Sequence, residues 1–274
     1  MRIVLYDAYN LIYRAKHALP PAMQKSEYGI MYAFFRSLAA LNRKLAPDRA
    51  YFVTEGKPVQ RLQLLPEYKG TRKHEKDEGF ARQRREIIQL VTDCFPIVVA
   101  NHSSHECDDV IAHLAKEHAA EGDEVIVVST DTDFLQLANT IPGYKQYNPI
   151  RKTFVDLPEH DYVAWKALTG DASDNIMGFR GIGNKRALSM LADPEKLASF
   201  LKTPEMQDKF ALNKRLISFI DISNEKNMIT FSKSTASMQE VKQQFHAMGF
   251  KTVLSEKGWT NFVNAFEVNN ETGR

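Results

Sequence analysis

The sequence predicts an α/β fold in which helices flank a mainly parallel central sheet, and three observations support this fold class. Short, nearly continuous apolar runs alternate with longer amphipathic segments through the first half of the chain. These runs are rich in Val, Ile and aromatic residues, as in parallel strands that are covered on both faces. The chain of 274 residues is 43% hydrophobic and can bury one sizeable core with a smaller satellite region.

The predicted elements alternate in the order that such a sheet requires. The expected strands cover residues 2–6, 49–53, 96–100 and 124–128. The expected helices cover residues 28–45, 80–93, 107–120 and 133–138. Ligands of open parallel sheets gather beyond the carboxyl ends of the strands, so the residues that follow each strand are candidate site residues.

Acidic residues recur at the points where a predicted strand or loop leads into a helix. They are Asp7, Glu106, Asp108, Asp109, Asp131, Asp133, Asp171 and Asp174. A single acidic residue in a first helical turn is usually a cap, but residues 106–109 supply three where one would suffice. Converging carboxylates repel one another unless hard cations such as Mg²⁺ or Mn²⁺ neutralise them. The joint placement therefore predicts a carboxylate-lined metal site.

Charge is balanced overall but unevenly distributed along the chain. There are 36 Lys and Arg residues against 34 Asp and Glu residues. Residues 106–133 contain nine acidic residues and one basic residue, whereas residues 57–85 contain nine basic and four acidic residues. This distribution suits an enzyme that holds cations in one place and a polyanion in another.

Composition also bears on the location of the protein. The sequence contains no apolar run long enough to span a bilayer, and its first residues read as a short strand and not as a signal peptide. We therefore expect a cytoplasmic protein that does not bind membranes. Cys94 and Cys107 are expected to be reduced, buried thiols, because one pair in so long a chain does not indicate a disulfide framework.

A glycine-rich turn occupies residues 178–187. Gly181 and Gly183 allow a tight turn, and Lys185 and Arg186 follow at the start of an expected helix. The segment has neither the preceding buried strand of a dinucleotide fingerprint nor the Lys-Ser/Thr ending of a P-loop. Two helices joined by such a turn are suited to non-specific contact with a DNA backbone. An ordinary glycine helix cap is the alternative interpretation.

A basic segment at residues 66–76 contains almost no core residues. Tyr68 lies beside Lys69, Arg72 and Lys73, and the basic Arg82 follows. A ring that can stack on a base beside cations that can bind phosphates is typical of single-strand binding. For residues 73–78, a solvated helix face is an equally good interpretation.

Together these motifs resemble the structure-specific 5′ nucleases, the flap endonuclease and 5′-3′ exonuclease family, which includes the nuclease domain of bacterial DNA polymerase I. Five segments carry the resemblance in the family's order and lie within about residues 1–195. They are residues 7–14, 65–72, 106–109, 129–133 and 170–187.

The resemblance implies a reaction and its site. The eight acids would surround two or more Mg²⁺ or Mn²⁺ ions, and K⁺ would bind at the glycine turn. Lys69 and Arg72 would contact the scissile phosphate at the base of a helical arch spanning about residues 57–85, with Arg14 near the same phosphate. The implied activity is metal-dependent hydrolysis of phosphodiesters in 5′-flap or 5′-ended DNA, in replication or repair, with RNA-DNA hybrids as further substrates.

The resemblance also implies how the chain is divided. Residues 1–165 would form the nuclease core, and residues 166–274 a helical DNA-binding region with a helix-hairpin-helix and a C-terminal extension. Lys202, Lys209, Lys214 and Arg215 suggest that the basic surface continues past the turn. Residues 231–269 have no assignment, and a monomer is expected.

The sequence departs from the family pattern at one expected ligand. Val53 and Thr54 occupy positions where the family places an Asp, and Glu55 is the nearest acid and is expected to replace it. A flap-binding protein of the same fold without catalysis is therefore the alternative function. A compact metal-dependent ribonuclease is a further alternative, although such domains normally lack the helical hairpin. His102 and His105 are expected to be local polar residues, because hard cations prefer oxygen ligands.

Overall fold

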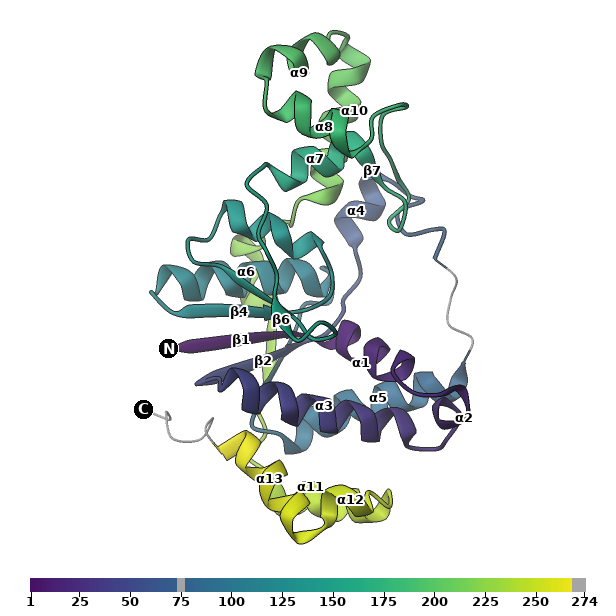
Figure 1. The fold of residues 1–274 in the computed structure, drawn as a ribbon, viewed down its shortest axis with the longest axis vertical. Helices are drawn as coiled ribbons and strands as arrows, with labels where there is room; N and C mark the ends of the chain where they lie inside the picture. Colours follow the sequence, from purple (N-terminus) through teal and green to yellow (C-terminus); the bar gives the residue numbers. More distant parts are fainter. Residues whose placement is uncertain (73–76, 268–274) are drawn as a thin grey trace.

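A seven-stranded sheet forms the middle of three layers in the computed structural model, which describes residues 1–72 and 77–267 (Figure 1). The strand order is β6-β5-β4-β1-β2-β3-β9. The strands are β1 (Arg2–Asp7), β2 (Arg49–Val53), β3 (Val98–Asn101), β4 (Glu124–Val128), β5 (Lys145–Asn148), β6 (Thr153–Phe154) and β9 (Thr230–Ser232). The five central strands are parallel to their neighbours, and the two edge strands are antiparallel. The predicted α/β class with a mainly parallel sheet is confirmed.

The predicted strand at residues 96–100 begins two residues late, at Val98. Pro96 has no N–H group to donate to a strand ladder, so pairing starts beyond it. The predicted helix at residues 133–138 is the 3₁₀ helix η1 (Asp133–Asn139). Strands β5, β6 and β9 were not predicted, since they have two to four residues each and the two edge strands expose their side chains.

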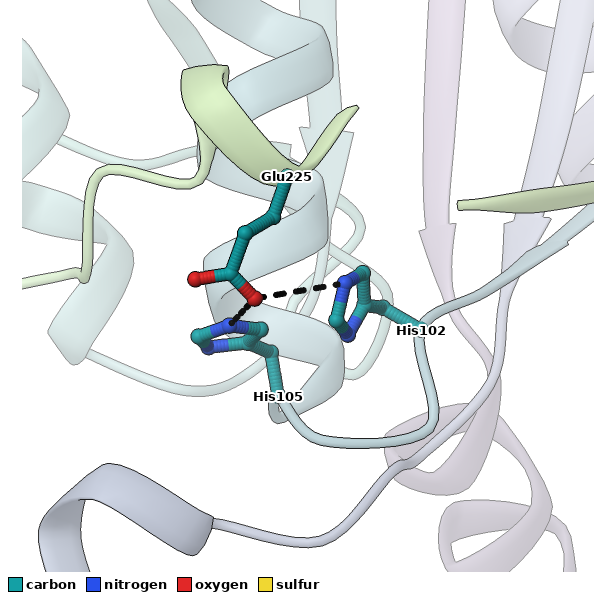
Figure 2. Close-up of side chains that lie close together, drawn as sticks. All are labelled: His102, His105 and Glu225. Atoms are coloured by element: carbon teal, nitrogen blue, oxygen red, sulfur yellow. Dashed lines mark hydrogen bonds and ion pairs between the residues drawn. The ribbon is translucent and has the colours of Figure 1, made fainter. Parts of the chain in front are cut away.

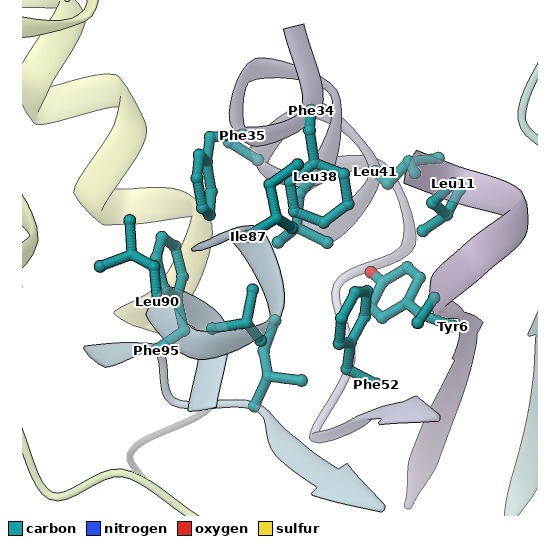
Figure 3. Packing of buried hydrophobic residues seen from close by; sticks show 14 of the residues in the cluster. Tyr6, Leu11, Phe34, Phe35, Leu38, Leu41, Phe52, Ile87, Leu90 and Phe95 are labelled. Carbon is teal, nitrogen blue, oxygen red and sulfur yellow. The ribbon is translucent and has the colours of Figure 1, made fainter. Parts of the chain in front are cut away.

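Helices cover both faces of the sheet, and alternate residues of β1 point into the two sides. Tyr6 packs on one side with α1 (Ala8–His17), α3 (Gly29–Leu45) and α5 (Glu78–Cys94). Phe34, Phe35, Phe52 and Phe95 fill this side of the core (Figure 3). Leu5 packs on the other side, with α6 (Cys107–Ala120) and η1. Two short helices lie in connections: α2 (Pro21–Gln24) between α1 and α3, and α4 (Val59–Leu64) between β2 and α5.

A helical region stands beyond the carboxyl edge of the sheet, in the upper part of Figure 1. Its helices are α7 (Tyr162–Thr169), α8 (Asn184–Leu191), α9 (Pro194–Phe200) and α10 (Pro204–Ile217). Between α7 and α8 lies a small antiparallel hairpin of β7 (Gly170–Asp171) and β8 (Ile176–Met177). The predicted glycine turn follows β8 and leads into α8, so the connection from α7 to α8 contains the β7–β8 hairpin as well as the turn.

The C-terminal part of the chain returns to the sheet. It consists of the 3₁₀ helix η2 (Ser223–Met228), β9, α11 (Met238–Ala247), α12 (Lys251–Leu254) and α13 (Glu256–Glu267). Strand β9 pairs with β3, and Phe245 stacks among Phe35, Phe250 and Phe262 of the large core. This arrangement differs from one helical region at residues 166–274, because the described residues after about 219 contribute to the core and to the sheet instead. Within the described residues, no helix is both long and apolar enough to cross a membrane.

Candidate active site

The register of the sheet brings acidic residues from several segments to one edge. Asp7 aligns with Val53 of β2, and Tyr6 aligns with Val128 of β4. Residues that closely follow those strands, Glu55 and Asp131, therefore reach the same edge as Asp7. A cavity of about 340 Å³ lies there. Its lining consists of Asp7, Tyr9, Asn10, Tyr13, Glu55, Lys69, Arg72, Cys107, Asp108 and Asp131.

The first acidic group consists of the four carboxylates of this cavity, on Glu55, Asp108, Asp131 and Asp7. Asp7 ends β1. It caps α1 by accepting from the amide of Asn10 at 3.0 Å, and it accepts from the Ser129 hydroxyl at 2.8 Å. Burial raises its pKa to about 7, with Asp131 and Glu55 adding to the rise and the two hydrogen bonds opposing it. Burial and the neighbouring Asp7 raise the pKa of Asp108 well above its usual value. Buried carboxylates this close together are poised for a cation.

Glu55 lies at the same edge of the sheet as Asp7, two residues after the end of β2. Its side chain lines the same cavity, and Oε2 accepts from the amide of Cys107 at 3.4 Å. Burial raises the pKa of Glu55. Thr54 instead points its hydroxyl toward the carbonyl of Ala100, at 3.4 Å. The expectation that Glu55 replaces the Asp is thus supported by position, and its role as a ligand stays a prediction.

A second acidic group consists of Asp133, Asp171 and Asp174, whose carboxylate oxygens lie within 4.8 Å of one another. Burial, with the charge of Asp131, raises the pKa of Asp133 to about 6. For Asp171, burial is outweighed by hydrogen bonds from Lys166 and Ser173, so its pKa is lowered. Asp131 links the two groups, because its Oδ1 accepts from the Asp133 amide at 2.9 Å and its charge acts on Asp7 as well. Both groups offer mainly oxygen ligands, which fit Mg²⁺ or Mn²⁺.

Cationic side chains form ion pairs with several of these acids. Lys69 pairs with Glu106, and the Arg72 guanidinium lies 2.5 Å from Asp174. Lys166 pairs with both Asp133 and Asp171, and sequence reasoning did not identify it. Its position on α7 five residues before Asp171 was the available signal, but the fold of the β7–β8 hairpin was needed to show that the two meet. These cations relieve part of the carboxylate repulsion that metal ions would otherwise relieve.

Asp109 does not join either acidic group, so its assignment as a metal ligand is corrected. Both of its oxygens accept from Arg61, at 2.7 and 2.8 Å, and one also accepts from the amide of Ile220. Arg61 was missed by sequence reasoning, which treated it only as part of a basic run. Glu106 lies between the two environments, since one oxygen pairs with Lys69 and the other accepts from Arg61 at 2.8 Å.

Two further assignments are corrected by position. The Tyr68 side chain cannot stack on a base, because the residue is only 5% exposed and packs with Ala167 and Leu216. Its hydroxyl instead donates to Asp174 at 2.8 Å. Arg14 does not reach the acidic cavity; it donates to Ser37 and lines a separate cavity of about 270 Å³.

The remaining predicted DNA contacts lie on other surfaces. Arg82 binds Glu86 on α5, and Lys73 lies outside the described residues. The glycine turn is exposed, with Gly181 at φ +78° and open space around Gly183. Lys185 and Arg186 are exposed at the start of α8, and Arg186 donates to the carbonyl of Gly181 at 3.0 Å. DNA contact by this exposed basic turn stays a prediction. Cys94 and Cys107 are buried free thiols, as predicted.

The chain was compared with curated proteins. It is 30% identical over 228 residues to the thermostable DNA polymerase I of Thermus filiformis, covering 80% of this chain and 27% of that protein. It is 34% identical over 209 residues to DNA polymerase I of Treponema pallidum, covering 69% of this chain and 20% of that protein. The chain therefore spans about a quarter of the length of these relatives.

Solved structures share the fold. The T5 D15 protein co-crystallized with metal ions matches with a TM-score of 0.61 and 22% identity, over 97% of this chain and all of that one. The T5 5′-exonuclease with bound zinc matches with a TM-score of 0.62 and 21% identity, over 98% of this chain and all of that one. At these identities the likeness concerns the fold alone.

A family comparison covers the part of the chain that builds the acidic cavity. Residues 2–160 match the family described as 5′-3′ exonuclease, N-terminal resolvase-like domain. This match includes more than half of the chain and contains Asp7, Glu55, Asp108, Asp131 and Asp133. The chain therefore belongs to the 5′-3′ exonuclease family.

Proposed function

We propose that this protein is a divalent-metal-dependent 5′ nuclease that hydrolyses phosphodiesters in 5′-flap or 5′-ended DNA. The observation that carries the proposal is the cavity in which Asp7, Asp108 and Asp131 face Lys69 and Arg72. Carboxylates that hold cations and basic groups that hold a phosphate are what such hydrolysis requires. The family match and the acid-rich edge of the sheet support the same reaction.

Asp7, Asp108 and Asp131, with Glu55, would hold one ion, and Asp131, Asp133, Asp171 and Asp174 would hold another. The bound ions supply an activated water near neutral pH and charge stabilisation for the leaving oxygen. Lys69 and Arg72 would leave their carboxylate partners and contact the phosphate, where they offset charge that develops on its oxygens. We propose Mg²⁺ or Mn²⁺ as the ions, because the ligands are mainly carboxylate oxygens.

The exposed turn at Gly181 and Gly183 is proposed to hold duplex DNA through its backbone and the adjacent Lys185 and Arg186. K⁺ at this turn, RNA-DNA hybrids as substrates and a monomeric state belong to the same proposal. The match to bacterial polymerases supports a cytoplasmic location in a bacterium or a phage-infected cell.

Catalysis is favoured over an inactive DNA-binding role by the position of Glu55. An inactive relative would be expected to have no carboxylate in place of the missing Asp, whereas here the carboxylate of Glu55 lines the cavity beside Asp7. The two functions differ in one measurable respect, since only the nuclease cleaves 5′-flap DNA when Mg²⁺ is added.

The direct test is cleavage of end-labelled 5′-flap, nicked duplex and RNA-primer substrates with and without Mg²⁺. Asp131→Asn should lower cleavage about 10³-fold, because it removes a carboxylate shared by both ion sites. Asp93→Asn, an exposed carboxylate at the end of α5, is the control and should cleave normally. Flap binding without cleavage by the wild type would select the inactive alternative.

Lys69→Ala separates a transition-state role from simple binding. Turnover should fall far more than affinity for flap DNA, since Lys69 acts on the reacting phosphate. Lys145→Ala, at the opposite edge of the sheet where Lys145 pairs with Glu124, should change neither. Equal losses of affinity and turnover would make Lys69 a binding residue only. Added salt should weaken DNA binding steeply in all variants, because phosphate contacts release counterions.

A further inference from the structure

Two buried histidines lie outside the acidic groups and face one carboxylate (Figure 2). His102 and His105 belong to the short loop between β3 and α6, and Glu225 belongs to η2. The histidine side chains are 0% and 1% exposed, and that of Glu225 is 40% exposed. Segments more than 100 residues apart in the chain therefore place two imidazoles and a carboxylate together.

The distances among these groups match those of a small metal site. Nε2 of His105 lies 3.1 Å from Oε2 of Glu225, and Nε2 of His102 lies 3.9 Å from the same oxygen. The two ring centroids are 4.5 Å apart. Ligands of a tetrahedral ion with bonds of about 2.0–2.1 Å lie roughly 3.3 Å from one another. One ligand atom of each residue lies within 4.8 Å of the other two, so the three atoms would have to move closer to share one ion.

An unsatisfied atom points to what this cluster binds. Nε2 of His102 is buried and has no hydrogen-bond partner among the described residues. Nε2 of His105 is hydrogen-bonded to Glu225, whereas Nε2 of His102 faces the same carboxylate at 3.9 Å without a hydrogen bond, and Nδ1 of His105 likewise has no hydrogen bond to a described residue. Buried polar atoms without a partner are rare and call for an explanation, and a cation shared with Glu225 supplies one.

The surroundings of the rings suit metal binding, with one local change. Nδ1 of His105 lies 4.0 Å from a carboxylate oxygen of Asp109, and the two atoms must approach before Asp109 can act as the outer partner that orients a metal-bound histidine. The amide of Ser104 donates to Nδ1 of His102 at 3.2 Å. With a metal on Nε2, Nδ1 carries the proton, so the Ser104 amide must turn away on binding.

We propose that His102, His105 and Glu225 bind one Zn²⁺ ion, with water as the fourth ligand. Two imidazoles and one carboxylate form a set that zinc accepts readily, whereas Mg²⁺ and Mn²⁺ favour the all-oxygen groups at the active site. The half-exposed Glu225 leaves room for the water. This proposal replaces the expectation that His102 and His105 are only local polar residues.

The role of this ion is structural. It joins η2, on the segment that returns from the helical region, to the loop that leads directly into Glu106 and α6. The same loop is already held from its other side, where the amide of Lys57 donates to the carbonyl of Ser103 at 3.0 Å. The ion would fix this loop between the residues after Glu55 and the returning chain.

The test uses the untagged full-length protein and Co²⁺ as a spectroscopic probe, with excess Mg²⁺ to occupy the carboxylate sites. We expect one Co²⁺ per chain with the intense visible absorption of tetrahedral coordination, and Zn²⁺ should displace it and raise the melting temperature. Glu225→Gln should weaken binding by more than about 100-fold, since loss of a direct ligand exceeds the loss of an outer partner. Because the Glu225 side chain is half-exposed, the Glu225→Gln variant should still fold.

Glu117→Gln is the matched control, because Glu117 is 43% exposed and pairs with Lys226 of η2 and with His113, whereas its carboxylate is not part of the cluster of His102, His105 and Glu225. It should bind Co²⁺ like the wild type. Asp131→Asn should lose cleavage and keep the Co²⁺ absorption, which separates this site from the proposed nuclease activity. Absence of tetrahedral absorption in the wild type, or an unchanged spectrum in Glu225→Gln, would overturn the proposal.

Discussion

Individual carboxylates at the strand ends carry charge that the fold alone does not compensate. The pKa of Asp7 is raised to about 7 by burial, with nearby Asp131 and Glu55 adding to the effect. In the metal-free native protein Asp7 therefore keeps a proton that the unfolded chain loses above about 4. The free energy of unfolding should consequently decrease as pH rises from about 4 to about 7, as far as this group contributes.

The same shift predicts how metal binding depends on pH. Affinity for Mg²⁺ or Mn²⁺ should rise with pH up to about 7 and then level off, because below that value the ion must displace the proton on Asp7. Calorimetric titrations on both sides of pH 7, in buffers of different ionisation enthalpy, measure affinity and proton release together. Asp7→Asn should bind more weakly and lose this part of the pH dependence. An affinity that does not change with pH in the wild type would contradict the assignment.

Strand ends were the part of the site that the sequence could predict. Asp7 and Asp131 follow buried apolar runs, so their meeting at one sheet edge follows from parallel topology. The sequence could not decide between Asp108 and Asp109, which point in different directions from the first turn of α6. Asp109 is turned away from the metal site by its contact with Arg61. These two residues lie 48 positions apart in the sequence, so the sequence pattern did not reveal the contact. Tyr68 was misassigned for a similar reason, since its burial depends on α7 and α10.

At the level of elements, Arg61 connects three helices. It extends from α4 to Glu106 and Asp109 at the start of α6, and its Nε and Nη2 also donate to the carbonyls of Leu216 and Ser218 at the end of α10. The guanidinium is almost fully buried, with only 4% of its side chain exposed. Both carboxylates are also buried, so Asp109 depends on this cation for charge compensation, and Glu106 shares it with Lys69.

Arg61→Gln should therefore lower the free energy of unfolding by about 3–5 kcal/mol, the range for one partner removed from a buried ion pair. Arg82→Gln is the matched control, because Arg82 forms an ion pair with Glu86 that is partly exposed along one helix. It should cost no more than about 0.5 kcal/mol. Urea unfolding followed by circular dichroism measures both. Equal stabilities of the two variants would show that the buried cluster is not held by Arg61.

The glycine turn before α8 offers a second test at this level. A methyl group added at Gly183 meets no atom within 4 Å, and its backbone is not in the left-handed region. Gly183→Ala should therefore leave the melting temperature unchanged and weaken binding to duplex DNA, since the added carbon separates the backbone from a phosphate. Gly79→Ala, at the start of α5, is a control that should alter neither property. Normal DNA affinity in Gly183→Ala would remove this turn from the proposed interface.

For the whole molecule, the unexpected feature is the return of the C-terminal segment. Residues 231–269 have no assignment from the sequence, and their apolar residues do not say which surface they cover. The structure places Phe245 and Phe262 against Phe35 and Phe95, on the side of the core opposite the helical region. A sequence predicts contacts between neighbouring elements far better than contacts between distant ones, so the central sheet was predictable and this packing was not.

Phe245→Ala tests whether this segment stabilises the core. The side chain is fully buried among four aromatic rings, so its loss should lower the free energy of unfolding by about 3–5 kcal/mol. Cleavage per folded molecule should stay close to that of the wild type, because the site lies at the other end of the sheet. Phe231→Ala is the control, since that ring is 51% exposed on the edge strand. An unchanged stability in Phe245→Ala would mean that the segment only rests on the surface.

The chain leaves the core after β6 and re-enters it before β9, so the helical region is attached at two points and not by one linker. The acids are divided by the same boundary, with Asp7, Asp108 and Asp131 on the sheet side and Asp171 and Asp174 on the helical side. If duplex DNA is held at the glycine turn, its distance from the acidic cavity is fixed by the protein. The position of the cut, counted in nucleotides from the junction, would then be a constant of the architecture, independent of the sequence of the DNA.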